Sequence, residues 1–360
     1  MAIDLDSQSY SDYCNPENEI SKVLLIGAGG VGAVVAYSLD YNQKCSVSLV
    51  VRRDYPVVSK EGYQFDSIDY GKISNWKPRD GSIFANISDA IKDKPYDYIL
   101  ISTKNLPDIT KFENIIEPLV IEKKTTIILF QNGFGNEVPF FEKYPNNIIL
   151  SGVTLIGSHN DNGKIHQIQK DRTYVSYFNN KHISTKIQEK KTLDFISIYQ
   201  NSTNQIIYQP DAQYHRYRKL VYNATLNTTC AITGVDVGRI DAFGGLQTII
   251  VPAMKEIISI AKADGVNLPD EIITDLIHSD DGDYFEPSML IDVKKGNPME
   301  LEVILGNVLK KAKLFNIDCP KLSMLYSLLS IIQFRLKEKK GLIPALPKDR
   351  PINPDTVYHL

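Results

Sequence analysis

The segment Lys22–Leu39, KVLLIGAGGVGAVVAYSL, decides how this chain folds. Largely apolar residues run into a glycine-rich stretch, and an apolar segment rich in alanine follows. Gly27, Gly29 and Gly32 form the pattern G-x-G-x-x-G between an expected strand and an expected helix. In that context the first glycine allows a tight turn, the second lets a pyrophosphate approach the backbone, and the third lets the helix pack closely. The pattern therefore predicts a dinucleotide-binding turn.

The start of the expected helix supports this interpretation. The first N–H groups of a helix have no partner within it, and the positive end of its dipole favours an anion. A glycine-rich turn in a different α/β fold is the alternative. We expect the dinucleotide to be contacted by Gly27, Ala28, Gly29, Gly30, Val31 and Gly32.

The composition is that of an ordinary globular protein. Of the 360 residues, 43% are hydrophobic and 23% are charged, and the formal net charge is −3. This balance gives no bias toward nucleic acid or a membrane surface, so neither is an expected partner. The cysteines show no C-x-x-C spacing, the first residues lack a basic targeting segment, and no apolar run reaches membrane-spanning length. We expect a cytoplasmic protein with no metal site.

The pattern of elements changes midway along the chain. The length favours two domains. Residues 21–209 alternate short apolar runs with helical segments, which predicts a Rossmann-type α/β domain with a parallel sheet. Residues 210–340 carry long amphipathic segments and predict an all-α domain. Residues 1–20 form a polar leader, open to disorder, and residues 341–360 form a proline-rich tail. The expected strands are KVLLIG, SVSLVV, YDYILIST, TTIILF, NIILSGVTLIG, TYVSYF and NQIIY.

The end of the second expected strand, SVSLVVRRD, indicates which dinucleotide binds. An NAD site usually has Asp or Glu here to accept from the ribose 2′-hydroxyl. This chain has Arg52 and Arg53, whose guanidinium groups suit a 2′-phosphate. The pattern therefore predicts NADP (NADPH) as the cofactor, with Arg52 binding it. In the alternatives, the arginines only end the strand at the surface, or Asp54 serves NAD.

Two further strand ends carry polar residues. Lys104 follows ILIST, and Asn132 and Gly133 follow IILFQ. Ligands of open α/β sheets lie beyond the carboxyl ends of the strands, so we expect Lys104 and Asn132 to contact the cofactor. The Asn-Gly step tolerates unusual backbone angles and lets the nicotinamide come close. Taken alone, each is equally well an ordinary loop residue.

In the helical part, RKLVYNATLN places Lys219, Asn223 and Asn227 four residues apart. On an α-helix this spacing sets them in one stripe, beside an apolar stripe that includes Leu220 and Ala224. Two asparagines inside a helix are unusual, because the amide prefers caps and turns. The stripe either faces solvent or lines a polar cleft.

Two later segments carry further polar candidates. YFEPSMLID is expected to begin a helix at Pro287–Ser288, where the Ser288 hydroxyl either caps the helix or binds an anion with the free N–H groups. Glu300 lies at the start of another expected helix after a Gly-Asn-Pro turn. Its carboxylate either complements the helix dipole or meets Lys219.

Together these motifs resemble the ketopantoate reductase (2-dehydropantoate 2-reductase) family. From about Lys22 to Lys337 they occur in the family's order: GAGGVG, Arg52, Lys104, QNGFGN, RKLVYNATLN, SMLID and the Glu300 segment. The resemblance implies NADPH-dependent reduction of 2-dehydropantoate to pantoate, a step of pantothenate biosynthesis. It also implies Lys219 as the general acid with Glu300 as its partner, Lys104 near the cofactor, and keto-acid contacts from Asn132, Asn223, Asn227 and Ser288.

This residue set suits the reduction of a ketone. Hydride delivery to the carbonyl carbon creates an alkoxide, and a charged lysine ammonium both stabilises it and supplies the proton. The segments DYFEP and GNPMELE depart from the family's pattern. A reductase of another 2-oxo acid or ketone therefore stays open, as does an inactive NADP-binding sensor or scaffold. The expected partner is a small-molecule 2-oxo acid, and a homodimer stays open.

Overall fold

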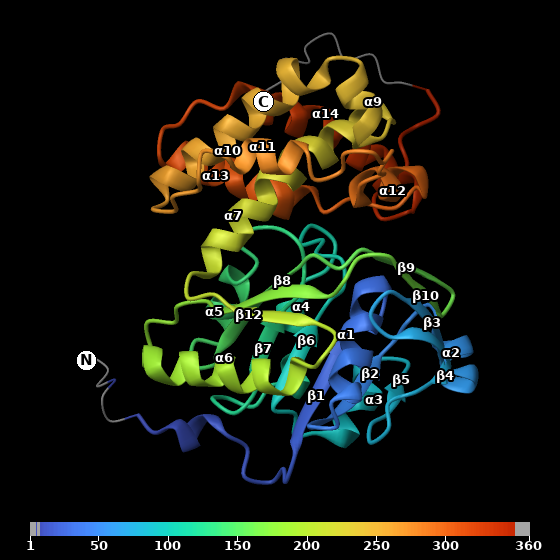
Figure 1. The fold of residues 1–360 in the computed structure, drawn as a ribbon, viewed down its shortest axis with the longest axis vertical. Helices are drawn as coiled ribbons and strands as arrows, with labels where there is room; N and C mark the ends of the chain where they lie inside the picture. The colour runs from blue at the N-terminus through green and yellow to red at the C-terminus, as the bar shows by residue number, and fades with distance from the viewer. Residues whose placement is uncertain (1–4, 6–7, 350–360) are drawn as a thin grey trace. The chain divides into compact units, whose positions relative to one another are not determined.

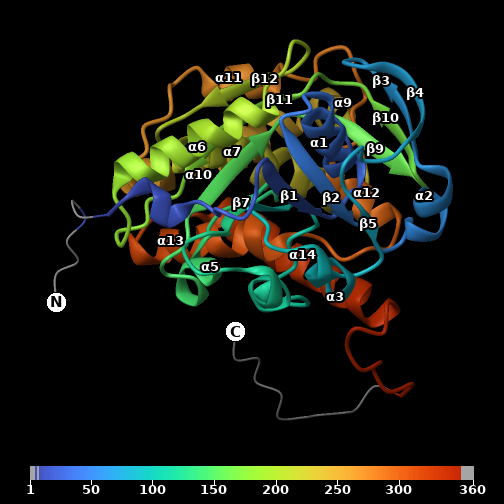
Figure 2. The same ribbon diagram turned by 90° about the horizontal axis from the view of Figure 1, so that it is seen from below.

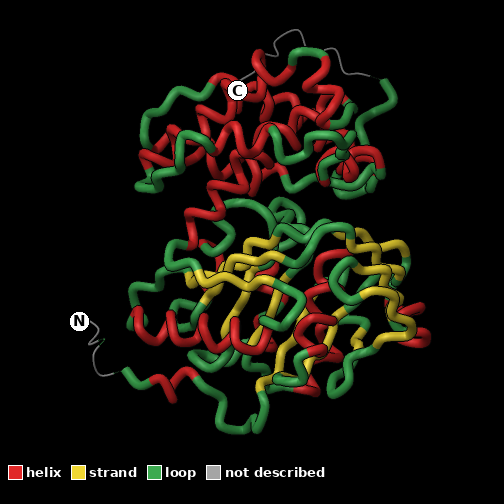
Figure 3. Tube along the Cα trace, viewed as in Figure 1, coloured by secondary structure: helices red, strands yellow, loops and turns green. Residues whose placement is uncertain are grey.

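The computed structural model describes residue 5 and residues 8–349. The chain divides into two compact units, the first ending at Lys219 and the second beginning at Leu220 (Figure 1). The first unit combines strands and helices, whereas the second is built from helices and loops (Figure 3). This arrangement confirms the fold class predicted from the sequence.

An eight-stranded sheet forms the centre of the first unit. Its strand order is β12-β11-β8-β7-β6-β1-β2-β5. β1 pairs in parallel with β2 on one side and with β6 on the other, so the strand order reverses at β1. Such a switch point is where open α/β sheets bind ligands. The strands are β1 (Ser21–Ile26), β2 (Cys45–Val50), β5 (Ile83–Phe84), β6 (Tyr98–Ile101), β7 (Thr126–Leu129), β8 (Ile149–Thr154), β11 (Arg172–Tyr177) and β12 (Gln205–Tyr208).

One pairing in this sheet differs from the prediction of a parallel sheet. β8 and β11 are antiparallel, whereas all the other pairs are parallel. Parallel neighbours need a crossover connection, which is usually a helix. Between β8 and β11 the chain forms only β9 (Ser158–Asp161) and β10 (Lys164–Gln167). The chain therefore returns in the opposite direction, and the sheet is mixed.

Alternate residues of the central strands point to opposite faces of the large sheet. Leu25 belongs to a core cluster that includes residues of α1 (Gly30–Tyr41) and α6 (Thr185–Tyr199). Leu24 belongs to a second cluster on the other face. In Figure 2, α1 and α6 lie on one side of the sheet, and α3 and α5 lie on the other. The helices of this second face are α3 (Ile87–Ala90), α4 (Phe112–Ile115) and α5 (Val138–Lys143).

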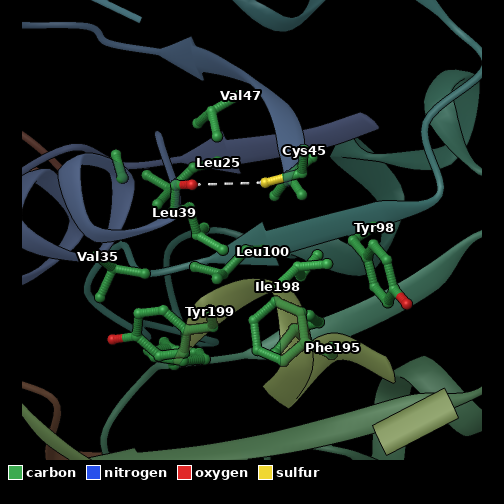
Figure 4. Packing of buried hydrophobic residues seen from close by; sticks show 14 of the residues in the cluster. Leu25, Val35, Leu39, Cys45, Val47, Tyr98, Leu100, Phe195, Ile198 and Tyr199 are labelled. Carbon is green, nitrogen blue, oxygen red and sulfur yellow. Dashed lines mark hydrogen bonds between the residues drawn. The ribbon is translucent and has the colours of Figure 1, made fainter. Parts of the chain in front are cut away.

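Burial on both faces explains why these strands are apolar nearly throughout. Figure 4 shows the first cluster, with Leu25 and Leu100 of the sheet and Phe195 and Tyr199 of α6 packed in one layer. Each buried leucine or phenylalanine side chain of this kind stabilises the fold by about 1.5–3 kcal/mol relative to its exposed state.

A second sheet of four strands, in the order β4-β3-β10-β9, was not predicted. It joins two hairpins that are distant in sequence, because β3 pairs in parallel with β10. α1 packs on β9 and β10, and Tyr37 of α1 contacts the rings of Phe65 and Trp76. Several of its residues are exposed, and stretches such as KIHQ contain no apolar run, so the sequence gives little sign of it. The remaining elements of this region are α2 (Tyr55–Glu61), β3 (Tyr63–Ser67) and β4 (Gly71–Trp76).

The second unit contains helices but no strand among its described residues. The long helix that begins as α7 continues through a π-helical turn at Asn223–Asn227 into α8, and it ends at Gly234, which has a φ of 76°. Two more π-helical turns occur at Leu246–Ile250 and Glu302–Gly306. Helix α7 (Ala212–Tyr222) crosses the boundary between the two units, since the first unit ends at Lys219. The other helices of the second unit are α8 (Thr228–Thr233), α9 (Val237–Ala242), α10 (Val251–Ala263), α11 (Ile272–Ile277), α12 (Ser288–Lys294), α13 (Asn307–Leu314) and α14 (Pro320–Lys339).

None of the helices in the described part of the chain is long and apolar enough to cross a membrane. Residues 341–349 of the predicted tail form neither helix nor strand. Residues 1–4, 6–7 and 350–360 of the predicted leader and tail lie outside the described residues.

The leader is packed against the first unit where the structure describes it. Tyr10–Tyr13 form a 3-10 turn, and the Tyr13 side chain is 2% exposed in the first core cluster. The Tyr10 hydroxyl donates to Asp194 of α6, and Gln8 Nε2 donates to the carbonyl of His182 at 2.8 Å. Residues 8–20 are therefore part of the folded first unit, because aromatic side chains within this polar segment reach the core.

We expect Tyr13→Ala to lower the free energy of unfolding by about 3 kcal/mol, because the change opens a cavity in a closed core. Urea denaturation followed by circular dichroism measures the effect. Glu17→Ala, at an exposed leader position, is the matched control and should change stability by less than about 0.5 kcal/mol. Equal effects of the two changes would show that the leader does not contribute to the core.

Candidate active site

The glycine-rich turn joins β1 to α1 with backbone packed against backbone. Gly27 has a φ of 99°, and a Cβ there would lie 2.5 Å from Cγ2 of Thr103. A Cβ on Gly32 would collide with the carbonyl of Gly27. A Cβ on Gly29 would meet nothing within 4 Å, so this position is open to an approaching group. These three environments fit the roles expected for the glycines of a dinucleotide-binding turn.

The small sheet supports the same turn from one side. Tyr63 OH donates to the carbonyl of Ala28 at 3.0 Å, and Asn160 Nδ2 approaches that carbonyl at 3.4 Å. A Cβ on Gly30 would lie 2.5 Å from the carbonyl oxygen of Ser158, at the start of β9. The turn is therefore fixed before any ligand binds, with the N-terminus of α1 at its end. Val31 lies in the first turn of that helix.

Arg52 and Arg53 are exposed beyond the end of β2, but they differ in their contacts. Arg53 Nε donates to Asp54 Oδ1 at 2.7 Å, and Asn160 Nδ2 donates to Asp54 Oδ2 at 2.8 Å. Asp54 is 4% exposed, and both oxygens of its carboxylate therefore have hydrogen-bond partners within the protein. The Arg52 side chain makes no hydrogen bond or ion pair within the described part of the chain.

Two neighbouring strands carry the other predicted cofactor residues. Ser102 Oγ, just beyond β6, donates to the carbonyl of Gly27 at 2.7 Å, and Lys104 follows it as an exposed side chain. Beyond β7, Gly133 has a φ of 101°, which turns the chain directly after Asn132. The carboxyl ends of β1, β6 and β7 therefore present Gly27, Lys104 and Asn132 at one edge of the sheet.

Lys219 joins this edge from helix α7. Its Nζ donates to Asn132 Oδ1 at 3.0 Å and to the carbonyl of Thr154, at the end of β8, at 2.7 Å. All three residues belong to the first unit. The structure thus brings together two of the residues predicted for catalysis and substrate binding, although 87 positions separate them. An ammonium held at this edge can stabilise negative charge and donate a proton.

Arg216, which the sequence analysis did not select, is the most buried cation of this region. It is 4% exposed, and it donates to the carbonyls of Leu129, Gln131 and Gly133 and to Ser151 Oγ. Burial lowers its pKa to about 10. The sequence does contain a sign that Arg216 is buried, because Arg216 lies four residues before Leu220 and eight before Ala224, on the same apolar stripe of the helix.

The asparagines of the second unit lie in a π-helical turn rather than in a regular α-helix. Asn227 is buried, and its Oδ1 accepts from the backbone N–H of Met289 at 2.8 Å. Its Nδ2 donates to Ser288 Oγ at 3.3 Å. The structure therefore brings the predicted residues Asn227 and Ser288 together at the start of α12. Asn223 is half-buried in the same turn.

Glu300 is buried in the second unit, just before the π-helical turn Glu302–Gly306. The side chain of Gln333 on α14 fixes the backbone beside it: Oε1 accepts from the N–H of Met299 at 2.8 Å, and Nε2 donates to the carbonyl of Met299 at 3.0 Å. Glu300 and Lys219 belong to different units, and their pairing stays a prediction.

His215 is a structural residue rather than a general acid. It is buried on α7 and stacks on the ring of Tyr174, with a centroid distance of 3.5 Å. Burial, together with the positive charges of Arg218 and Arg172, lowers its pKa to about 4. A neutral imidazole in this position has no proton to give at neutral pH. Among the described residues, no group of three or more His, Cys, Asp or Glu side chains could hold a metal ion.

Comparison with known proteins identifies the family. Residues 23–180 match the family described as ketopantoate reductase PanE/ApbA, and residues 211–333 match the C-terminal part of that family. "Uncharacterized protein YDL144C" of Saccharomyces cerevisiae is 38% identical over 349 residues, which cover 90% of this chain and 97% of the yeast protein.

Two solved structures share the fold. The crystal structure of 2-dehydropantoate 2-reductase from Geobacter metallireducens has a TM-score of 0.75 and 25% identity, covering 86% of this chain and 99% of that one. The ternary structure of D-mandelate dehydrogenase with NADH and anilino(oxo)acetate has a TM-score of 0.74 and 20% identity, covering 88% and 99%. At the latter identity the likeness shows the fold alone.

A dinucleotide-binding turn in a Rossmann-type unit, a lysine at the end of its sheet and a helical unit after it are the features of a nicotinamide-dependent oxidoreductase. The two matches together span most of the chain. The chain belongs to the ketopantoate reductase family.

We expect His215 to make stability depend on pH. Its pKa in the folded state lies below the value of about 6.5 in an unfolded chain, so the unfolded state binds more protons between pH 6.5 and 4. Stability is therefore lost as the pH falls through this window. Relative to His215→Phe, the wild type should lose about 1 to 2 kcal/mol between pH 7 and pH 5 in urea denaturation.

The exposed His182 provides the control for this measurement. His182→Phe should leave the pH dependence of the wild type unchanged. If His215→Phe follows the wild-type pH dependence as closely as His182→Phe does, the imidazole of His215 is not held neutral.

Proposed function

We propose that this chain is an NADPH-dependent 2-dehydropantoate 2-reductase that converts 2-dehydropantoate to pantoate. The observation that carries the proposal is the position of Lys219. Its ammonium is held by Asn132 Oδ1 and the Thr154 carbonyl at the same edge of the sheet as the glycine-rich turn. This position supports a role for Lys219 as the proton donor beside a nicotinamide cofactor bound to that turn.

The residues of the chain supply what reduction of a keto group requires. NADPH, when bound, supplies the hydride to the carbonyl carbon, and the carbonyl oxygen takes up a proton from Lys219. The charged ammonium stabilises the alkoxide as it forms, so charge stabilisation and proton transfer come from one group. Asn132, which accepts from the ammonium, keeps that group oriented.

The second unit contributes the remaining proposed residues. Ser288 is exposed at the start of α12, and its hydroxyl suits a carboxylate of the keto acid. Asn227 already uses both ends of its amide on Ser288 and Met289, which supports a role in holding Ser288 for the substrate. We assign Asn223 to substrate binding and Glu300 to pairing with Lys219, in line with the family resemblance.

The contacts of Asp54 support NADPH rather than NADH. Arg53 and Asn160 occupy the Asp54 carboxylate, which is the acceptor that this strand end could offer to a ribose 2′-hydroxyl. Arg52 is exposed at the same strand end, and a guanidinium group binds a phosphate through charge-assisted hydrogen bonds. We therefore assign Arg52 to the 2′-phosphate and Lys104 to the cofactor near the reaction centre.

A reductase of another 2-oxo acid or ketone is the second candidate. D-mandelate dehydrogenase shares the fold, so the fold does not select the substrate. The segment before Ser288 also departs from the family pattern, with Phe285 half-buried and Glu286 paired with Lys294.

An assay of NADPH oxidation separates the candidates. It is run with 2-dehydropantoate and with a panel of other 2-oxo acids, including one with an aryl group. The highest kcat/KM with 2-dehydropantoate is expected. A higher value with another acid replaces the substrate assignment, and no turnover with any of them while NADPH binds would favour a sensor or scaffold.

Lys219→Ala should lower kcat by about 100-fold or more, because it removes the general acid. The KM for the keto acid should change less, since the ammonium acts mainly on the charge that develops during reaction. Steady-state kinetics at saturating NADPH measure both. Lys186→Ala, at an exposed position of α6, is the control. An unchanged kcat in Lys219→Ala would rule out this mechanism.

Arg52→Ala should weaken NADPH binding by about 10- to 100-fold, the loss expected for charge-assisted hydrogen bonds to a phosphate, and should leave NADH binding nearly unchanged. Fluorescence titration of each cofactor measures the two dissociation constants. Arg79→Ala removes an exposed arginine from the same unit and serves as the control. Equal weakening of both cofactors by Arg52→Ala would contradict a contact with the 2′-phosphate.

A further inference from the structure

The buried guanidinium of Arg216 is unusual because no carboxylate in the described part of the chain pairs with it directly: burial lowers its pKa more than the negative charge of Glu137 raises it. Within the described residues, no carboxylate lies within salt-bridge distance of it. Taking a cation out of water is costly unless hydrogen bonds replace its hydration. Here four hydrogen bonds do so, and every acceptor is neutral. An apolar residue would fill the same space without this cost, so the arrangement calls for an explanation beyond packing.

The acceptors of Arg216 bracket Asn132. Nη1 donates to the carbonyls of Gln131 at 2.7 Å and Gly133 at 3.0 Å, which flank Asn132 on both sides. Nη2 donates to the carbonyl of Leu129, the last residue of β7, at 2.8 Å. The guanidinium therefore fixes the backbone on which the Asn132 side chain is carried.

Arg216 also shares its second anchor with Lys219. Its Nε donates to Ser151 Oγ on β8 at 2.9 Å, and Lys219 Nζ donates to Thr154 at the end of the same strand. The two cations stand three residues apart on α7, a spacing that places them on one side of a helix. Both thus bind the same two segments, residues 129–133 and 151–154.

We propose that Arg216 is a positioning residue that sets the ammonium of Lys219 against Asn132. It joins α7 to the loop after β7, so the proton donor and its amide partner move as one body. The inference rests on the proposed function of Lys219 as the proton donor. Arg216 itself acts through Lys219 and Asn132.

The planar fork of the guanidinium is essential to this role. It directs several N–H donors in fixed directions, whereas a lysine ammonium is a point charge on a flexible chain. Arg216→Lys keeps the charge and loses the fork. Because a misplacement of about 1 Å at a reacting group can cost about 100-fold in rate, we expect this change to lower kcat by about 10- to 100-fold.

The first test compares Arg216→Lys with Arg218→Lys, the same substitution at a partly exposed position of the same helix. NADPH oxidation with 2-dehydropantoate, or with the best acid of the panel, is measured at a temperature where circular dichroism shows full folding. Arg216→Lys should lower kcat, whereas Arg218→Lys should not. A lower melting temperature with unchanged kcat would show that Arg216 is only structural.

The second test is a double-mutant cycle with Lys219→Ala. If Arg216 acts through Lys219, adding Arg216→Lys to Lys219→Ala should cause little further loss of kcat. If the loss of kcat in the double mutant equals the product of the losses in the two single mutants, the two residues act independently and the proposal is wrong. Ser151→Ala removes one acceptor of Arg216, preserves the other three hydrogen bonds, and should lower kcat several-fold. If Arg216→Lys does not fold, Ser151→Ala replaces it in the double-mutant cycle.

A crystal structure of Arg216→Lys, or of Ser151→Ala, separates this inference from the proposed function. The distance from Lys219 Nζ to Asn132 Oδ1 should lengthen beyond hydrogen-bonding range in Arg216→Lys and change in the same direction in Ser151→Ala. This readout needs no substrate, so it holds even if no acid is turned over. An ammonium that keeps both of its contacts would overturn the inference.

Discussion

The close approach of β1, α1 and the end of β6 at the glycine-rich turn is the constraint on which the structure depends. Gly32 packs on the carbonyl of Gly27, Gly27 packs on Thr103, and Ser102 donates to that same carbonyl. Even one methyl group at Gly27 or Gly32 would separate the strand from the helix or from β6. The absence of side chains therefore fixes the switch point of the sheet, and the carboxyl ends of the strands converge there.

The strands buried on both faces could be predicted, because a short and nearly continuous run of apolar residues is typical of a strand covered on both faces in an α/β domain. The small sheet could not, because strands such as Lys164–Gln167 place half of their residues in solvent. The antiparallel pairing of β11 depends on what connects it to β8, which strand patterns do not specify. The packing of the leader could not be predicted from its polar composition, because a single aromatic residue such as Tyr13 is enough to anchor it to the core.

The site shows a similar division. Strand-end position and family resemblance selected Asn132 and Lys219, which the fold brings into contact, and Asn227 and Ser288, which also meet. The predicted stripe assumed a regular α-helix, but hydrogen bonds from i to i+5 in the π-helical turn shift the residues beyond Asn223 around the axis. Arg216 was missed because a charge on an apolar stripe counts against burial unless its acceptors are known.

The small sheet affects the order in which the chain can fold while it is being synthesised. The carbonyl of Ala28 is held by Tyr63 and Asn160, and β3 is completed only by pairing with β10, about a hundred positions later. Contacts of such wide sequence separation form late, since a long loop must close first. A ribosome-bound chain that has emerged only to β8 therefore carries every residue of the glycine-rich turn without its full scaffold, because Asn160 and the partner strand of β3 lie in the second hairpin.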